Sequence, residues 1–145
     1  MSKEALSELL LNGNSSSQLE FAESCNDEED LYLFAYNYNW GDGFSIPSAI
    51  INNFNCTLNI ALMIFYAGDG YSYLLEKPKD AKSKEWFEFI TDLYAKIKNN
   101  KFKIGKAAFT VPLTKVQIFK LKKTLSDEEQ VFINDISGFD CNIEL

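Results

Sequence analysis

The apolar positions of this chain recur mainly three and four residues apart, which is the spacing of one face of an amphipathic helix. Leu31, Phe34 and Tyr38 follow this spacing, and so do Trp86 and the apolar residues after it. The run at residues 60–65 is apolar on nearly every side, so its helix should lie at the centre of the fold. Together these patterns predict helices over residues 2–11, 17–24, 27–38, 47–53, 58–67, 80–99, 112–124 and 126–137.

Capping residues indicate where several of these helices begin. Ser17 with Glu20, and Ser126 with Glu129, have the three-residue spacing of a capping box. Gly and Asn residues between the helices permit the sharp turns that connect them. The other expected starting positions are Asn26 or Asp27, Pro47, Asn55 or Thr57, Asp80, and Pro112.

Residues 101–111 show a different pattern, in which apolar and polar side chains alternate. Alternation is typical of a strand, so a short β-hairpin is one expectation for this segment. The strand–helix alternation of an α/β protein is not visible elsewhere. The chain is therefore expected to form one all-α domain over residues 1–145, a compact array of short antiparallel helices arranged as helical hairpins.

Two residue types are missing from the sequence. It has no His, the commonest general base, and all 14 of its basic residues are Lys, so Arg is absent as well. Catalytic triads with His, His-ligated zinc and arginine clamps for phosphate are therefore excluded within this chain. The three Cys are widely spaced without a Cys-x-x-Cys motif, which favours buried free thiols. We expect no catalytic residues, no metal site and no cofactor.

Hydropathy bears on where the protein acts. The most hydrophobic stretch covers residues 60–67, far fewer than the roughly 20 residues that a membrane-spanning helix needs. The first residues carry acids and lack the long apolar run of a signal peptide. These features predict a cytoplasmic protein that does not bind a membrane.

Charge is unevenly distributed along the chain, whose formal net charge is −7. Residues 1–72 hold ten acids and one Lys, whereas residues 77–123 hold thirteen Lys and four acids. The sharpest acidic run consists of Asp27, Glu28, Glu29 and Asp30. These acids suit the first turn of a helix, whose dipole favours negative charge, but four in a row also predict a surface that attracts a basic protein. The lysine-rich segment lacks Arg and fits the polar face of a helix, so no nucleic-acid binding is expected.

The stretch NYNWGDGF, residues 37–44, stands between two predicted helices. Its spacing fits neither an EF-hand calcium loop nor a glycine-rich phosphate loop. One interpretation is a structural corner, with Trp40 packed on the neighbouring helices. Another is an amphipathic patch that binds a protein, formed by Tyr36, Trp40, Asp42, Asp69, Tyr71 and Tyr73. Asp42 and Asp69 could instead be the acid and base of a small enzyme or ligand-binding domain.

Residues 37–71 resemble the core of an uncharacterised bacterial family, the domain of unknown function DUF4274. The shared features are an Asn-x-Asn-Trp-x-Asp-Gly step, a helix opened by Pro, an Asn-x-Asn-Cys turn, and an Ala-Leu helix that ends near Asp-Gly. In this chain they are Asn37, Asn39, Trp40, Asp42, Gly43, Pro47, Asn53, Asn55, Cys56, Ala61, Leu62, Asp69 and Gly70. The resemblance implies a small helical bacterial cytosolic domain and implies no activity.

The leading hypothesis from the sequence is a non-enzymatic protein-binding domain. A small acidic chain with clustered acids and tyrosines is typical of an immunity protein, which neutralises a cognate bacterial toxin in toxin–antitoxin or contact-dependent inhibition systems. The acidic run would then cover the toxin's basic active site. The alternatives are the carboxylate-based enzyme or ligand-binding domain described above, and a helical adaptor within larger cellular machinery.

Overall fold

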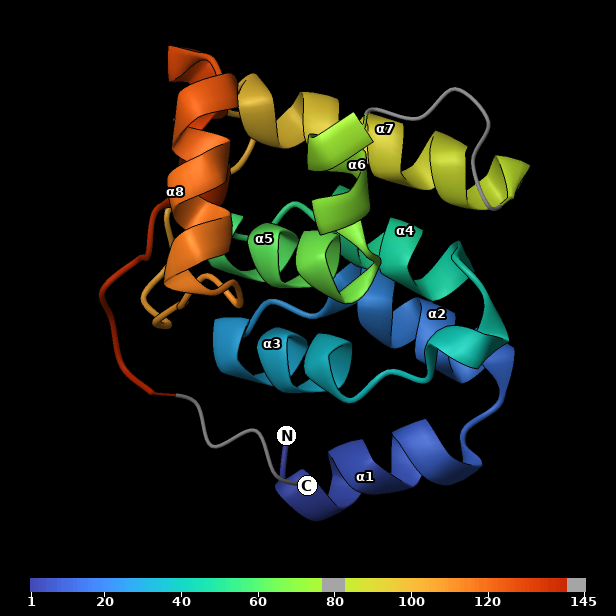
Figure 1. Cartoon of the computed structure of the whole chain (residues 1–145). Helices are drawn as coiled ribbons and strands as arrows, with labels where there is room; N and C mark the ends of the chain where they lie inside the picture. Colours follow the sequence, from blue (N-terminus) through green and yellow to red (C-terminus); the bar gives the residue numbers. More distant parts are fainter. Residues whose placement is uncertain (77–82, 141–145) are drawn as a thin grey trace.

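The computed structural model describes residues 1–76 and 83–140, and almost all of its regular structure is helical (Figure 1). The elements are α1 (Lys3–Asn12), α2 (Ser15–Ser24), α3 (Glu28–Tyr36), the 3-10 helix η1 (Trp40–Asp42), α4 (Ser45–Asn52), α5 (Leu58–Ala67), α6 (Gly70–Glu76), α7 (Lys84–Lys98), α8 (Lys115–Thr124) and the 3-10 helix η2 (Asp127–Ile133). Among the described residues, β-pairing is limited to two isolated bridges, so the all-α prediction is confirmed. None of the helices in this described part is both long enough and apolar enough to cross a membrane.

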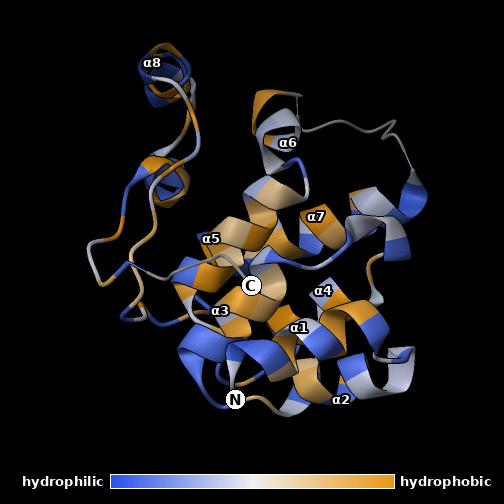
Figure 2. Ribbon diagram, turned by 90° about the horizontal axis from the view of Figure 1, so that it is seen from below, coloured by the Kyte–Doolittle hydropathy of each residue, from blue (hydrophilic) through white to orange (hydrophobic). Residues whose placement is uncertain are grey.

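Helix α5 lies at the centre of the array, as the sequence predicts. All residues from Asn59 to Phe65 are buried, because this run is almost entirely apolar. Helices α3 and α7 both pack against α5, and α2 packs against α4. In Figure 1, α1, α3, α5 and α7 follow one another as layers from bottom to top, and Figure 2 shows many of their hydrophobic residues gathered between the layers.

Helix α7 is the clearest amphipathic helix. Its buried residues are Trp86, Phe89, Ile90, Leu93 and Ile97, which recur at the predicted helical spacing. The hydroxyl of Ser83 caps the helix by accepting a hydrogen bond from the N–H of Trp86 at 3.0 Å. The expected start at Asp80 lies outside the described residues.

Two helices begin earlier than the sequence predicts. The side chain of Asn14 accepts a hydrogen bond from the N–H of Ser17, so Ser17 lies in the first turn of α2 and does not cap it. Helix α4 begins at Ser45, two residues before Pro47. Proline fits this position because the first N–H groups of a helix have no partner within the helix.

The helices after residue 111 also differ from expectation. Helix α8 follows a capping box of Thr114 and Gln117, so Pro112 does not open it. The predicted capping box of Ser126 and Glu129 is confirmed, but it opens the short η2 and not a helix that reaches residue 137. A local capping signal therefore marks where a helix starts without fixing its length.

The expected β-hairpin within residues 101–111 is wrong. Phe109 instead exchanges both backbone hydrogen bonds with Ile136, at 2.9 and 2.8 Å, and Ala107 forms a bridge with Phe139. The alternating pattern does mark extended chain, but the segment that pairs with it follows η2.

Helix α6 is absent from the sequence-based prediction, which treated residues 68–70 only as the end of α5. Asp69 has a φ of 64°, a left-handed conformation, and α6 starts at the next residue. Glycine is required at position 70 because a Cβ atom there would overlap the ring of Phe65.

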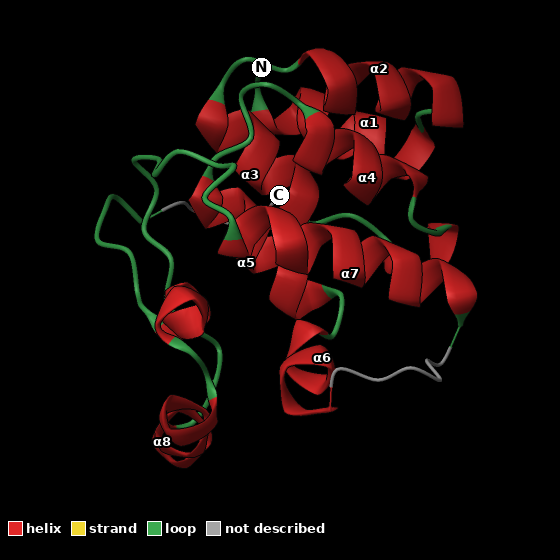
Figure 3. Cartoon of the chain, turned by 90° about the horizontal axis from the view of Figure 1, so that it is seen from above, coloured by secondary structure: helices red, strands yellow, loops and turns green. Residues whose placement is uncertain are grey.

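We call residues 106–140 the arm and the remaining described residues the body. Figures 2 and 3 show α8 standing to one side of the other helices. The element η2 attaches the arm to the body, since Phe132 is fully buried and its ring stacks on Tyr94 of α7 with 5.2 Å between centroids. The arm is therefore anchored at η2, while α8 extends beyond it.

Candidate functional site

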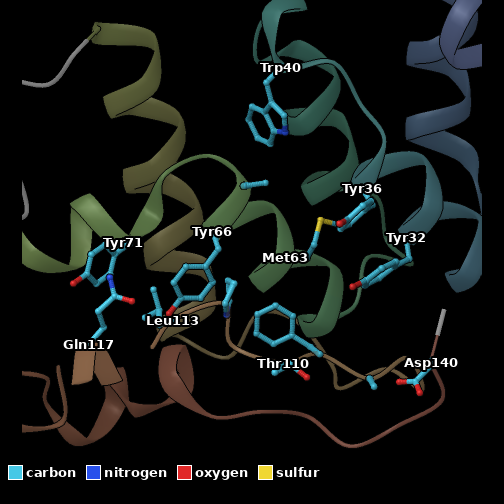
Figure 4. A pocket seen from close by; sticks show the side chains of 14 residues that line it. Tyr32, Tyr36, Trp40, Met63, Tyr66, Tyr71, Thr110, Leu113, Gln117 and Asp140 are labelled. Atoms are coloured by element: carbon cyan, nitrogen blue, oxygen red, sulfur yellow. The ribbon is translucent and has the colours of Figure 1, made fainter. Parts of the chain in front are cut away.

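A groove of about 850 Å³ lies between the body and the arm (Figure 4). The body wall comes from α3, α5, the start of α6, and η1, and the arm wall comes mainly from the segment before α8. The lining residues are Tyr32, Tyr36, Trp40, Met63, Tyr66, Ala67, Tyr71, Ala108, Phe109, Thr110, Pro112, Leu113, Gln117 and Asp140. The groove is thus strongly aromatic, with several phenol hydroxyls among its polar groups.

Helix α3 contributes a pair of tyrosines to the groove. Tyr32 and Tyr36 stand one helical turn apart, so their rings stack with centroids 6.5 Å apart and planes at 9°. Figure 4 shows both hydroxyls directed into the groove. Tyr36 is 48% exposed, whereas Tyr32 is 9% exposed. The exposed Glu29 lies on the same face of α3, because the three residues follow the i, i+3, i+7 spacing.

Tyr66, near the end of α5, joins the two walls. Its hydroxyl donates a hydrogen bond to the backbone carbonyl of Phe132 in η2 at 2.5 Å. Its ring also stacks on Phe109 of the arm, with 6.3 Å between centroids. Burial raises the pKa of the Tyr66 phenol, so this group stays protonated and remains a donor at neutral pH. Tyr66 is therefore part of the groove's framework.

Two side chains of the body hold the start of the arm in place. The carboxylate of Glu28 accepts hydrogen bonds from the backbone N–H groups of Lys106 at 2.8 Å and Ala107 at 2.7 Å. The amide of the fully buried Asn59 accepts the N–H of Gly105 at 2.7 Å and donates to the carbonyl of Ala107. These bonds position the segment that continues into the arm wall.

The structure gives the four acids of the predicted partner-binding run separate tasks. Asp27 caps α3 by accepting the N–H of Asp30 at 2.9 Å, while Glu28 binds the arm. The carboxylate of Asp30 lies 2.9 Å from the ammonium group of Met1. Glu29 is exposed and forms no hydrogen bond or ion pair with other described residues. Glu29 is thus the one acid of this run that has no structural contact with another described residue.

The NYNWGDGF stretch forms the corner between α3 and α4. The side chain of Asn39 accepts the N–H of Gly41, and the hydroxyl of Tyr38 donates to the carbonyl of Gly43 at 2.9 Å. Gly43 has a φ of 99°, which favours glycine. Trp40 packs edge-on against Tyr38, Phe44 and Phe89, and it also lines one end of the groove. The corner is therefore structural and presents Trp40 to the groove at the same time.

Asp42 and Asp69 lie in different surroundings. Asp42 is exposed and lines a separate hollow of about 520 Å³, whereas the carboxylate of Asp69 accepts a hydrogen bond from the hydroxyl of Ser72 at 2.9 Å. The described cavities include none that both carboxylates line. The hollow of Asp42 is also lined by Gly43, Phe44, Ser45, Ser48, Asn52, Glu85, Glu88, Phe89 and Asp92, and we call it the acidic hollow.

In the part of the chain that the structure describes, no three His, Cys, Asp or Glu side chains are grouped to hold a metal ion.

The predicted tyrosines on α6 are divided between the groove and the core. Tyr71 is half-buried and lines the groove. Tyr73 is 7% exposed and packs against Phe87 and Tyr94 of α7, so it lies in the core. The structure therefore brings Tyr36, Trp40 and Tyr71 together in the groove.

Sequence reasoning missed Tyr32, Tyr66 and the whole arm wall. The four-residue spacing of Tyr32 and Tyr36 was a usable signal, because it places two phenols on one face of a helix. No local signal marks Phe109 or Asp140 as groove residues, since their neighbours in the groove are distant in the sequence.

Residues 26–98 match the model of a family described as "Domain of unknown function (DUF4274)". This match covers half of the chain, so the chain belongs to that family, and the predicted resemblance is confirmed. No curated protein and no solved structure matches the chain. The family region includes the body wall of the groove and excludes the arm.

Proposed function

We propose that this chain is a protein-binding domain and that the tyrosine-lined groove is its binding surface. The observation that carries this proposal is the presence of four tyrosines and one tryptophan along an open groove, with Tyr36 and Tyr71 accessible. Tyr and Trp supply rigid apolar contact area with a polar edge, and they are enriched in protein interfaces. Exposed Tyr36 can supply contact area, while the framework residue Tyr66 keeps the groove in shape.

Charge at the groove supports a basic partner. Asp140 lines the groove, exposed Glu29 lies on the same face of α3 as Tyr32 and Tyr36, and no lysine belongs to the described lining residues. A Lys or Arg side chain entering the groove would meet these carboxylates and the faces of tyrosine rings, both of which attract a cation. The formal net charge of −7 would also speed the encounter with a basic protein.

The more specific role that we propose is that of an immunity protein, which neutralises a cognate bacterial toxin by covering its basic active site. Support comes from the small acidic chain, which lacks His and Arg. The separate surroundings of Asp42 and Asp69 favour binding over acid–base catalysis by this pair. A helical adaptor could use the same groove, so the identity of the partner distinguishes the two roles.

Co-expression tests the immunity role. The probe is the protein encoded beside this gene, produced in bacteria with and without the chain. We expect that protein to stop growth when it is expressed alone, and the chain to restore growth and to co-purify with it. A neighbouring product that is harmless, or that stays toxic beside the chain, would refute this role.

Substitutions in the groove test the binding surface with the same probe. Because contacts at the centre of an interface dominate affinity, Tyr36→Ala and Tyr71→Ala should each weaken binding about tenfold or more. Phe54→Ala is the matched control, since Phe54 is an aromatic residue that is 86% exposed and does not line the groove. Unchanged affinity of both tyrosine variants, with circular dichroism like that of the wild type, would exclude the groove as the binding surface.

A further inference from the structure

Helix α8 carries apolar side chains on its solvent-facing side. Val116 is 62% exposed and Phe119 is 59% exposed, and their three-residue spacing places them side by side. On the opposite side of the helix, Leu121 is the buried residue that fixes α8 to the arm. A helix normally buries such a strip, so this face is suited to contact with another surface.

Lysines surround the exposed strip of α8. They are Lys115, Lys120, Lys122 and Lys123, all of them exposed. The ammonium group of Lys123 lies 4.3 Å from the centroid of the Phe119 ring. None of the four forms an ion pair with a described residue. The matching surface should therefore be apolar at its centre and acidic around it.

The acidic hollow combines acids with two aromatic residues. Phe44 and Phe89 provide its apolar part, and its acids come from η1 and from the outer face of α7. Asp92 is already paired with Lys96 at 2.8 Å, and Glu88 lies 3.9 Å from Lys84, an exposed and weak pair. Asp42 and Glu85 form no ion pair within the described chain, so the hollow retains negative charge that a lysine could meet.

The two surfaces lie at opposite ends of the molecule. Figure 1 shows α8 on the left, whereas η1 and the N-terminal half of α7 lie on the right. One chain therefore cannot bring its own α8 to its own acidic hollow. We propose that α8 of one copy docks in the acidic hollow of a second copy, so that the chains associate head to tail.

This contact differs from the groove of the proposed function and does not depend on it. A head-to-tail contact leaves one α8 and one hollow free at the two ends of a dimer, so further copies can add as concentration rises. The negative net charge of each copy opposes association, and the local contact between lysines and acids offsets it. Weak association that increases with concentration is the expected behaviour.

Sedimentation velocity of the full chain over a range of concentrations tests the proposal. Lys120→Glu with Lys123→Glu cancels the net positive charge of the four α8 lysines, and Glu85→Lys with Glu88→Lys cancels the net negative charge of the four acids in the hollow. We expect the wild type to associate and each of these double variants to be monomeric, because one of its two surfaces no longer carries the net charge that attracts the other. Mixing the two variants should restore association, since each offers the surface that the other lacks.

Charge-matched controls separate docking from a general charge effect. Lys101→Glu with Lys103→Glu, and Glu20→Lys with Glu23→Lys, change the net charge equally at exposed positions elsewhere, so these variants should associate like the wild type. A wild type that stays monomeric up to about 1 mM, the range of the weakest specific contacts, would overturn the proposal. It would also be overturned if the mixed variants stay monomeric, or if monomeric wild type instead binds vesicles of phosphatidylglycerol through α8.

Discussion

Replacing Glu28 by Ala should destabilise the protein, because its carboxylate attaches the arm to the body. The substitution removes the acceptor for the N–H of Ala107, a residue with no exposed surface. A buried donor left without a partner costs about 1–3 kcal/mol. The N–H of the exposed Lys106 can turn to water, so it adds little, and the lost acid in the first turn of α3 adds about 0.3–1 kcal/mol. We expect a loss of about 2–3 kcal/mol in the free energy of unfolding.

Urea unfolding followed by tryptophan fluorescence measures this loss, since Trp40 and Trp86 both lie in the body. In thermal unfolding it corresponds to a drop of roughly 5–10 °C in Tm for a chain of this size. Glu29→Ala is the matched control: the neighbouring acid is exposed and lies in the same first turn, so it should lose only the helix-dipole contribution of about 0.3–1 kcal/mol. The assignment of Glu28 to structure and Glu29 to the surface is wrong if both variants lose the same stability, or if Glu28→Ala loses none.

Three further predictions concern a buried amide, a buried phenol and the thiols. Asn59→Ala should cost about 2–4 kcal/mol in urea unfolding, because it leaves the N–H of Gly105 and the carbonyl of Ala107 unpaired beside a cavity; a loss below 1 kcal/mol would contradict this role. Tyr66→Phe bears on alkaline stability. The pKa of Tyr66 is raised above its ordinary 10.0, so the folded state keeps the proton longer, and the free energy of unfolding of the wild type should fall as pH rises above 10. The fall should be shallower in Tyr66→Phe, and parallel curves would exclude the effect. In a Cys141→Ser background at pH 8, a thiol reagent should label half-buried Cys25 before Cys56, because burial raises the pKa of Cys56 to about 12; equal labelling rates in the folded protein would refute this.

Local signals predicted the elements whose cause is local. The apolar run of α5 depends on residues within one or two turns, and so do the caps Asp27 and Thr57, each of which was one of two predicted candidates. Pro112 and Ser17 misled the prediction because a stronger cap, Thr114 in one case and Asn14 in the other, lies three residues or fewer away. Where a helix starts thus depends on which of two neighbouring capping residues is used. A single capping motif does not show this competition.

The candidate site was less predictable because its contacts are distant in the sequence. Glu28 stands next to Glu29 in an acidic run, yet its partners are 78 and 79 residues away. Tyr73 was grouped with Tyr71, but α6 turns successive side chains to different sides and directs Tyr73 into the core. Packing between helices that are distant in the sequence therefore decides which tyrosines share a surface.

Helix α8 is attached by buried Leu121 and partly buried Ile118, and this limited packing has a consequence for fluctuations of the native state. A segment with so little buried surface should open far more often than α5, and amide hydrogens in it should exchange faster. The groove wall at residues 108–113 leads directly into this segment, so anything held in the groove joins the labile part of the chain to the rigid part. A ligand bound in the groove would then slow amide hydrogen exchange in the arm in proportion to its concentration. Amide exchange in α5 would stay almost unchanged.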